Sequence, residues 1–393
     1  MDASDLRIAL FSGNYNYVRD GANQALNRLV DYLQRQGATV RIYSPTVKEP
    51  AFPPNGEVVH VPAVPFPGRS EYRAPLFIPS KVKRDVRRFR PNIFHVASPE
   101  VLGHRAVTLA HKLDLPVIAS VHTRFETYPR YYGLAFLEPL MLAALRRFYR
   151  RCDAIFAPSD SMAQLLREQR MNYHVGIWTR GIDREIFNTG RRDLEWRRSL
   201  GIDDDVPVIG FVGRLVMEKG LDVFSDVIDR LEQRQVRHKV LVVGEGPARD
   251  WFEKRLPQAC FVGFQAGPDL GRAVASMDML FNPSVTETFG NVTLEAMAAG
   301  LPVVAAIATG SQSLVTDGVT GRLIRAGAID GFADALASYC ADENVRAAAG
   351  HAGVEVSMRY GWDAVNQALV DAYLRVLRQR AAGGTRPKPS PVP

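Results

Sequence analysis

The segment LRIALFSGNYNYVRDGANQALNRLVDYLQRQGATVRIY, residues 6–43, decides the fold class. It opens with a strand-like apolar run, passes through a glycine- and asparagine-containing loop at 13–21, and then spaces apolar residues three and four positions apart. That spacing predicts a helix with one buried face, and the apolar run at 39–43 predicts a second strand directly after it. A strand, a helix and a strand in this order indicate a parallel, doubly wound α/β sheet.

The same architecture restarts in the second half of the chain. Strands are expected at 93–97, 117–122, 154–157, 208–212, 239–243 and 279–283. We therefore predict two Rossmann-like domains, with ligands in the cleft between them. The predicted organisation is a first domain at 1–190, a charged linker at 191–205, a second domain at 206–360, a C-terminal helix at 361–380 and a disordered Gly/Pro-rich tail at 381–393. Nine prolines between 45 and 79 predict irregular surface chain there, with one short strand at 58–61.

Composition excludes several classes of protein. With 46% hydrophobic and 23% charged residues among 393, the chain is neither disordered nor fibrous. Three widely separated cysteines exclude a disulfide scaffold and a cysteine zinc site, and they fit a reducing cytosol. No stretch reaches the roughly 18 apolar residues of a membrane span. We therefore expect a cytoplasmic protein whose membrane contact is peripheral, on the inner face of the cytoplasmic membrane.

The net charge of +7 is unevenly distributed. Residues 1–185 carry 26 basic and 17 acidic side chains, a balance of +9, whereas the remainder has a balance of −2. This asymmetry suggests that the first half meets an anionic surface or ligand.

Three loops of the second half follow strands and have the composition of a nucleotide diphosphate site. Residues 213–220 place Arg214 and Lys219 in a loop that opens a helix, where two cations suit a diphosphate; solvated charges on an ordinary loop are the alternative. Residues 243–247, with Gly244, allow the backbone to approach a ligand closely. Residues 286–297 combine two glutamates with a glycine at a helix start, so that backbone N–H groups face an anion and carboxylates accept from sugar hydroxyls.

In combination these motifs resemble the signature of the family 4 retaining glycosyltransferases of the GT-B fold. The resemblance rests on Glu287 and Glu295 with the intervening Phe289-Gly290, on the Gly213–Gly220 segment, and on the turn Asp317-Gly318…Gly321. It extends over residues 6 to about 378 and implies an enzyme, a nucleotide-sugar-dependent hexosyltransferase.

The resemblance also implies roles for individual residues. Arg214 and Lys219 would neutralise the donor diphosphate and Glu287 would bind the transferred sugar, with His122 near its 6-position. Glu295 would hold the ribose hydroxyls. The other donor-binding positions are Gly21, Gly213, Gly244, Val262, Phe289, Gly290 and Asn291. The C-terminal helix would return to pack on the first domain.

Charge development explains why these residue types suit the reaction. Glycosyl transfer builds negative charge on the departing diphosphate, so fixed cations there stabilise the transition state more than the ground state. The resemblance implies same-face attack with retention of configuration. No Asp-x-Asp motif stands in a suitable loop, so we expect neither a metal nor another cofactor.

The acceptor is predicted from the first domain. Two basic clusters look like amphipathic helices suited to an anionic membrane surface: Lys81, Lys83, Arg84, Arg87 and Arg88 in one, and Arg146 and Arg147 in the other. Solvated helix faces are the alternative. The segments around Tyr128…Gly133 and Trp178…Asp183 resemble the glycolipid-forming branch, which includes diacylglycerol glycosyltransferases, sulfoquinovosyl-type transferases and mannosyltransferases. Arg180 departs from the commoner asparagine of the family, which favours that branch.

Other functions remain open at this stage. The donor base can be uridine or guanosine, and the acceptor can be a lipid, a soluble molecule or a polysaccharide. A GT-B sugar phosphorylase or epimerase is a second class. A basic nucleic-acid-binding protein is a third, but no zinc finger, RNP-type motif or recognition-helix pattern supports it, so we expect no nucleic-acid partner.

Overall fold

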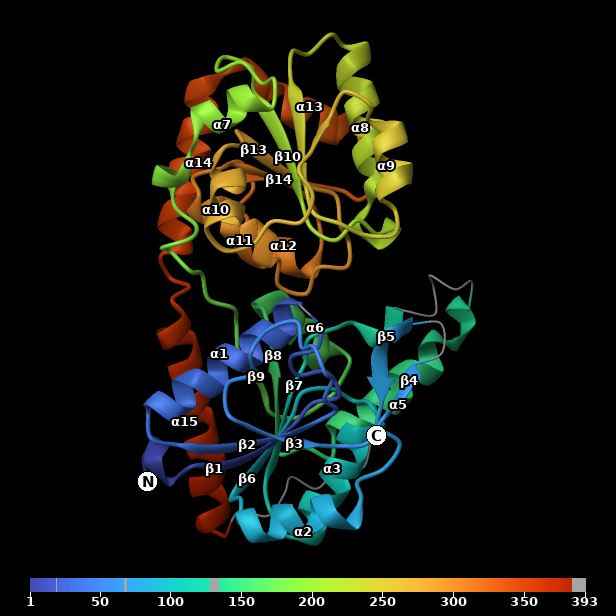
Figure 1. Ribbon diagram of the computed structural model, residues 1–393, viewed down its shortest axis with the longest axis vertical. Helices are drawn as coiled ribbons and strands as arrows, with labels where there is room; N and C mark the ends of the chain where they lie inside the picture. The colour runs from blue at the N-terminus through green and yellow to red at the C-terminus, as the bar shows by residue number, and fades with distance from the viewer. Residues whose placement is uncertain (19, 67–68, 128–133, 384–393) are drawn as a thin grey trace. The chain divides into compact units, whose positions relative to one another are not determined.

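Two parallel sheets organise the structure (Figure 1). The computed structural model describes residues 1–18, 20–66, 69–127 and 134–383. It divides into unit 1, which contains Met1–Arg180 and the segment beginning at Trp362, and unit 2, which contains Gly181–Gly361. Each unit is an α/β structure around its own parallel sheet, which confirms the predicted pair of Rossmann-like domains.

Unit 1 has a seven-stranded parallel sheet in the order β3-β2-β1-β6-β7-β8-β9. Its strands are β1 (Arg7–Phe11), β2 (Thr39–Ser44), β3 (Glu57–His60), β6 (Ile93–Val96), β7 (Val117–Ser120), β8 (Ala154–Ala157) and β9 (Val175–Ile177). A separate antiparallel pair is formed by β4 (Val64–Phe66) and β5 (Arg69–Ala74). The helices are α1 (Gly21–Arg35), α2 (Ser80–Phe89), α3 (Val101–Lys112), α5 (Glu138–Tyr149), α6 (Asp160–Glu168) and α15 (Trp362–Ala381).

Strand β1 shows why the sheet is covered on both faces. Ile8 and Leu10 belong to the core beneath α1 and α15, whereas Ala9 and Phe11 belong to the core beneath α2 and α3. Alternate side chains of a strand point to opposite faces, so a continuous apolar run is required where both faces are buried. Within the first of these cores, Leu369 and Tyr373 of α15 are fully buried, so the last helix of the chain packs on the first sheet.

Unit 2 has a six-stranded parallel sheet in the order β12-β11-β10-β13-β14-β15. Its strands are β10 (Val208–Val212), β11 (Lys239–Val243), β12 (Cys260–Phe261), β13 (Met279–Asn282), β14 (Val303–Ala306) and β15 (Gly321–Ile324). Its helices are α7 (Leu194–Ser199), α8 (Leu221–Gln233), α9 (Arg249–Arg255), α10 (Gly267–Ala275), α11 (Asn291–Ala298), α12 (Thr309–Leu314), α13 (Ile329–Ala341) and α14 (Glu343–Ser357). Its β10 alternates as β1 does: Val208 faces one core, and Ile209 and Phe211 face the other.

The predicted linker at 191–205 is wrong. The two units divide at Arg180 and Gly181, before the predicted boundary at 190, and the segment 191–205 is an integral part of unit 2. Helix α7 lies within it and is capped by the Asp193 carboxylate, which accepts from the Trp196 amide at 2.8 Å. Arg197 is fully buried and donates to Asp278 at 2.9 Å. One of the charges that suggested a linker therefore belongs to a buried ion pair with a distant residue.

The proline-rich segment is also more regular than predicted. It contains β3, as expected, but also the β4–β5 pair, which was not predicted. Pro65 lies inside β4, which is tolerated because this pair is outside the main sheet and a register shift occurs at 65–66. At the other end of the chain, α15 continues to Ala381, and residues 384–393 of the predicted tail lie outside the described part of the chain.

Candidate active site

The centre of the sheet in unit 2 is a topological switch point. Strands β10 and β13 are neighbours, and the chain leaves them toward opposite edges of the sheet. In open α/β sheets the crevice at the carboxyl ends of two such strands is the usual ligand site. The loops that follow these two strands, 213–220 and 283–290, are the two that carry the predicted cations and the predicted sugar-binding glutamate.

Lys219 and Glu287 meet across this switch point. The Lys219 Nζ donates to the Glu287 Oε1 at 2.6 Å, and the two side chains are 32% and 19% exposed. Lys219 belongs to a short 3-10 turn, Met217–Lys219, immediately before α8. The structure therefore brings together two residues that the sequence predicts separately, and it pairs the cation with the carboxylate.

The loops after β10, β11 and β12 pack against one another through their backbones. The Gly213 amide donates to the Val243 carbonyl at 3.0 Å, and the Gly244 amide donates to the Gly263 carbonyl at 2.8 Å. A Cβ atom on Gly244 would lie 1.9 Å from the Gly213 carbonyl oxygen. Gly244 is thus required for contact between two loops, which differs from the direct approach to a ligand that its sequence context suggests. Val262 extends this backbone contact by donating to the Val242 carbonyl at 3.1 Å. Arg214, which follows Gly213 in the chain, is exposed.

The loop 287–290 is fixed from behind by the start of α12. The Glu287 carbonyl accepts from the Gly310 amide at 2.8 Å and from the Thr309 hydroxyl at 2.7 Å. Sequence reasoning missed these two residues, although a small Thr-Gly pair after a strand is the available signal. Phe289 is buried in the core, so only its backbone can serve a ligand. Gly290 precedes α11 with a left-handed φ of 97°, which leaves the Asn291 end of the helix open to an anion.

Glu295 lies one turn into α11. Burial raises the pKa of its carboxyl to about 7. Its carboxylate has no hydrogen-bond partner among the residues that the structure describes. A carboxyl group in this state titrates near neutral pH and is available to accept hydrogen bonds from a ligand.

Unit 1 has its own switch point, between β1 and β6. Gly21 is the first residue of α1, and the Asp20 carboxylate caps that helix by accepting from the Asn23 amide at 2.8 Å. Glu100, which sequence reasoning missed, lies at the end of the neighbouring loop and accepts from the Ser98 hydroxyl at 2.7 Å. Burial raises the pKa of both acidic groups. The predicted glycine therefore begins a helix at this switch point, directly after an acidic residue whose carboxylate caps that helix.

His122 follows β7 in the same unit and is bonded through both ring nitrogens. Its Nε2 lies 2.8 Å from the Ser120 Oγ, and its Nδ1 lies 2.7 Å from an Arg180 guanidinium nitrogen. Beyond Ser120 the contacts continue to His95 and Tyr373, neither of which was predicted. His95 was not predicted as a site residue because it lies inside an apolar strand, Ile-Phe-His-Val, where a histidine is expected to be part of the core.

The first basic cluster lies on α2. Lys81, Lys83, Arg84, Arg87 and Arg88 are all exposed, whereas the apolar residues of the helix, Val82, Val86 and Phe89, are buried in the core. The helix is amphipathic, as predicted, but its apolar face is used by the fold and cannot also enter a bilayer. Two exposed apolar residues, Leu76 and Phe77, precede the helix at 52% and 56% exposure.

The second basic cluster lies on α5 and is partly engaged within the fold. Arg146 donates to the Gln169 carbonyl at 3.0 Å, whereas Arg147 is exposed. Exposed apolar side chains instead lie at the start of α5, with Leu140 at 68%, and in the 3-10 turn Ala135–Leu137 before it, with Phe136 at 74%. The segment Tyr128…Gly133 lies outside the described residues. Among the helices of the described residues, none combines the length and apolar character needed to cross a bilayer.

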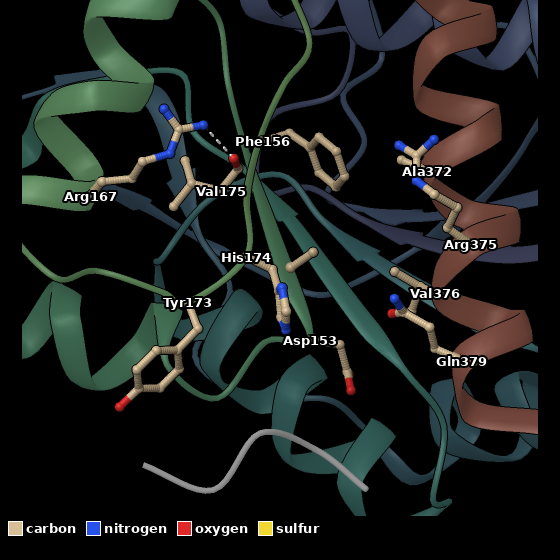
Figure 2. A pocket seen from close by; sticks show the side chains of 12 residues that line it. Asp153, Phe156, Arg167, Tyr173, His174, Val175, Ala372, Arg375, Val376 and Gln379 are labelled. Carbon is tan, nitrogen blue, oxygen red and sulfur yellow. Dashed lines mark hydrogen bonds between the residues drawn. The ribbon is translucent and has the colours of Figure 1, made fainter. Parts of the chain in front are cut away.

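A cavity of about 320 Å³ lies elsewhere in unit 1 (Figure 2). It is bounded by α15, through Arg375 and Gln379, and by Asp153 and His174, which precede β8 and β9. These residues mark the amino ends of the strands, opposite the carboxyl ends where the predicted site residues lie. The cavity contains none of the predicted site residues, so we do not assign the site to it.

Comparison with protein families gives two matches that together span most of the chain. Residues 19–186 match the model described as Glycosyltransferase Family 4, and residues 206–342 match the one described as Glycosyl transferases group 1.

Relatives of known name match over similar lengths. The chain is 30% identical to the sulfoquinovosyl transferase SQD2 of Arabidopsis thaliana, over 91% of this chain and 71% of that one. It is 32% identical to a GDP-mannose-dependent alpha-mannosyltransferase of Mycolicibacterium smegmatis, over 84% and 87%. It is 26% identical to the alpha-monoglucosyldiacylglycerol synthase of Streptococcus pneumoniae, over 81% and 75%.

Among solved structures, the sucrose-phosphate synthase of Thermosynechococcus elongatus has a similar fold. The TM-score is 0.75 at 19% identity, with 96% of this chain and 99% of that chain covered.

Proposed function

Because the chain belongs to glycosyltransferase family 4 and has the GT-B fold, we propose that it transfers a hexose or hexuronic acid from a UDP- or GDP-linked donor to a membrane lipid such as diacylglycerol, with retention of anomeric configuration. The enzyme class follows from family membership. The acceptor, the stereochemistry and the roles of single residues are the parts that we propose.

The contact between Lys219 and Glu287 carries the proposal. In the structure the Lys219 ammonium and the Glu287 carboxylate form an ion pair at 2.6 Å. A donor diphosphate arriving at this crevice would compete for the Lys219 ammonium, and Glu287 would then be released to accept from the sugar hydroxyls. One ion pair would thereby be exchanged for two substrate contacts, which limits the desolvation penalty of binding. Arg214, in the same loop, would add a second cation with a forked donor geometry.

The chemical step would then follow from charge. The bond between the anomeric carbon and the diphosphate oxygen breaks, and a bond from the acceptor hydroxyl oxygen forms on the same face. The hydroxyl proton passes to the departing diphosphate. Lys219, Arg214 and the amides at the start of α11 stabilise the negative charge that develops on this group. The exposed ring of Phe264, in the loop after β12, offers a surface on which the base would stack.

Support for a lipid acceptor comes from unit 1. The exposed basic face of α2 lies directly after the exposed Leu76 and Phe77. Phe136, just before α5, and Leu140, in its first turn, are also exposed. A cationic surface beside apolar side chains suits the interface of an anionic bilayer. One relative is, by its name, a synthase of an alpha-monoglucosyldiacylglycerol, which supports the same choice.

The direct test of the function uses vesicles that contain diacylglycerol and anionic lipid, together with labelled UDP- and GDP-sugars. The proposal predicts that the full chain forms one labelled glycolipid and that NMR of the product shows the anomeric configuration of the donor. Transfer to soluble acceptors alone would contradict the lipid part, and an inverted product would contradict the stereochemistry.

Vesicle binding is expected to depend on α2. Replacing Lys83, Arg87 and Arg88 by glutamine should lower the partition onto anionic vesicles roughly a hundredfold at low salt, because each basic residue near such a surface contributes about 1 kcal/mol. A matched control replaces three exposed basic residues of unit 2, Lys254, Arg325 and Arg359, which removes the same charge. Sedimentation with vesicles measures both variants, and equal losses would show that only net charge matters.

Donor binding is expected to depend on pH through Glu295. Its pKa of about 7 means that the carboxylate, the stronger acceptor for ribose hydroxyls, dominates above neutral pH. The KM for the nucleotide sugar, whose diphosphate diester does not titrate in this range, should therefore fall several-fold from pH 6 to pH 8. In Glu295→Gln the KM should be higher and nearly flat with pH. An unchanged pH profile in that variant would remove Glu295 from donor binding.

A further inference from the structure

A chain of four hydrogen bonds crosses unit 1 from Arg180 to the C-terminal helix. It connects Arg180 Nη2 to His122 Nδ1 at 2.7 Å, His122 Nε2 to Ser120 Oγ at 2.8 Å, Ser120 Oγ to His95 Nε2 at 2.9 Å, and His95 Nδ1 to the Tyr373 hydroxyl at 2.7 Å. The five residues come from the segment after β9, from β7 and its end, from β6 and from α15. They are far apart in the sequence, so the sheet and α15 must both be in place for the chain to exist.

Arg180 sets the direction of the first two bonds. A guanidinium group only donates, so His122 Nδ1 must accept. The imidazole proton then lies on Nε2, which donates to the Ser120 oxygen. The choice of tautomer is therefore made by Arg180, since no other state of His122 forms both bonds while the ring is neutral.

The surroundings hold the ring neutral. Burial, and then the charge of Arg180, lower the pKa of His122 well below its ordinary value. His95 is itself fully buried, with a pKa lowered to about 3 by that burial, so it adds no charge at neutral pH. Burial lowers the pKa of Arg180 to about 10, while Asp20 at the start of α1 favours its charged form.

Arg180 is itself fixed in place. It is 4% exposed and donates to the carbonyls of Trp178 and Thr179 at 3.1 Å each. Its guanidinium lies 5.0 Å from the centre of the Trp178 ring, whose Nε1 donates to Asn366 of α15 at 3.3 Å. The edge of His122 meets the same indole, with ring centres 5.8 Å apart. Indole, guanidinium and imidazole form one packed unit.

We propose that Arg180 is a positioning residue that holds His122 as the neutral Nε2–H tautomer with both ring nitrogens bonded inside the protein, so that a sugar bound beside His122 would meet its ring surface and not a nitrogen hydrogen bond. This differs from the direct contact that the family resemblance implies. The placement of the sugar near His122 rests on the proposed function, whereas the tautomer does not.

The first test reads the tautomer directly. The full chain is labelled with ¹⁵N-histidine, and the His122 signals are assigned by their loss in His122→Gln. The expected result is an Nε2–H tautomer whose shifts stay constant from pH 5.5 to pH 8.5. A proton on Nδ1, or a titration within this range, would overturn the proposal without any further variant.

Two substitutions separate positioning from packing. Arg180→Lys keeps a group that only donates, so the tautomer should persist. Arg180→Met removes donor and charge while filling the space, so His122 Nδ1 loses the bond that fixes its tautomer and the ¹⁵N signals should show a mixture of Nε2–H and Nδ1–H rings. Burial, the largest cause of the lowered pKa of His122, persists in this variant, so the ring should stay neutral. We expect kcat/KM to fall about 10- to 100-fold in Arg180→Met and less in Arg180→Lys. Equal losses in both variants, with the Nε2–H tautomer kept in both, would indicate a packing role only.

A third test adds the nucleotide sugar to the ¹⁵N-labelled protein. If the proposal holds, donor binding does not change the ¹⁵N chemical shifts of the two His122 nitrogens, because their bonds to Ser120 and Arg180 are kept. A large shift at either nitrogen would show direct contact with the sugar and would overturn it. A chain that transfers no sugar at all would contradict the proposed function while leaving the tautomer result unaffected.

Discussion

Replacing Lys219 by alanine is expected to lower kcat/KM for the nucleotide sugar by about 10²–10³, because one preorganised contact to the developing negative charge is lost. The side chain is 32% exposed and its ion pair with Glu287 is partly solvated. Such a pair contributes about 1 kcal/mol or less to the free energy of unfolding, so the midpoint of thermal unfolding should change by no more than about 4 °C. Activity and stability are thus expected to separate.

A suitable control for this variant is Lys254→Ala, which removes an exposed lysine from α9 of the same unit. It should leave both kcat/KM and the unfolding midpoint close to those of the unsubstituted chain. Steady-state kinetics with the nucleotide sugar that the enzyme uses measures the difference in kcat/KM between the two variants. If Lys219→Ala kept transfer within threefold of normal, the crevice between β10 and β13 would not be the diphosphate site.

Replacing Glu287 by alanine is expected to abolish most of the transfer, again by about 10²–10³ in kcat/KM, through the opposite partner of the same ion pair. The loss should be confined to ligands that carry the sugar. Binding of the nucleoside diphosphate alone should be unchanged or tighter, because the Lys219 ammonium no longer has to break an ion pair within the protein before it binds the diphosphate. Calorimetry with UDP and GDP, and with the corresponding sugar nucleotides, measures both effects.

The exposed Glu218, in the loop that also holds Lys219, provides the matched control for Glu287. Glu218→Ala should retain activity. In the double variant of Lys219 and Glu287, the two losses should combine to about their product or slightly more, because the two groups contact different parts of the donor and each single change already removes the ion pair that competes with binding. Weaker binding of UDP or GDP in Glu287→Ala would contradict the idea that this carboxylate contacts the sugar and competes with the diphosphate.

The fold could be predicted because its signals are local. The apolar runs of β1 and β10 and the 3–4 spacing of α1 and α8 are set by neighbours in the chain, and the structure follows them closely. The linker was misjudged because Arg197 looks solvated until its partner is known, and Asp278 is 81 residues away. The β4–β5 pair was missed because prolines obscure a strand pattern that only pairing makes regular.

The candidate site was predicted in the same uneven way. Lys219 and Glu287 were found because each stands directly after a strand, in a loop of recognisable composition, but nothing in the sequence showed that they touch. The bonds from Arg180 through His122 to Tyr373 could not be inferred, since they depend on β6, β7 and α15 being side by side. Local composition thus predicts which loops carry chemistry, while the internal partners of a group come from packing.

The discontinuity of unit 1 has a consequence for biosynthesis. Its last helix, α15, leaves the ribosome only after the whole of unit 2, yet its side chains complete the core around Leu26 and Trp178. Unit 2 is continuous in the chain and can fold during translation. The sheet of unit 1 is synthesised earlier, but one of its apolar faces stays partly uncovered until α15 has been made. A nascent chain stalled before Trp362 should therefore expose that face to chaperones, although most of the polypeptide has already been made.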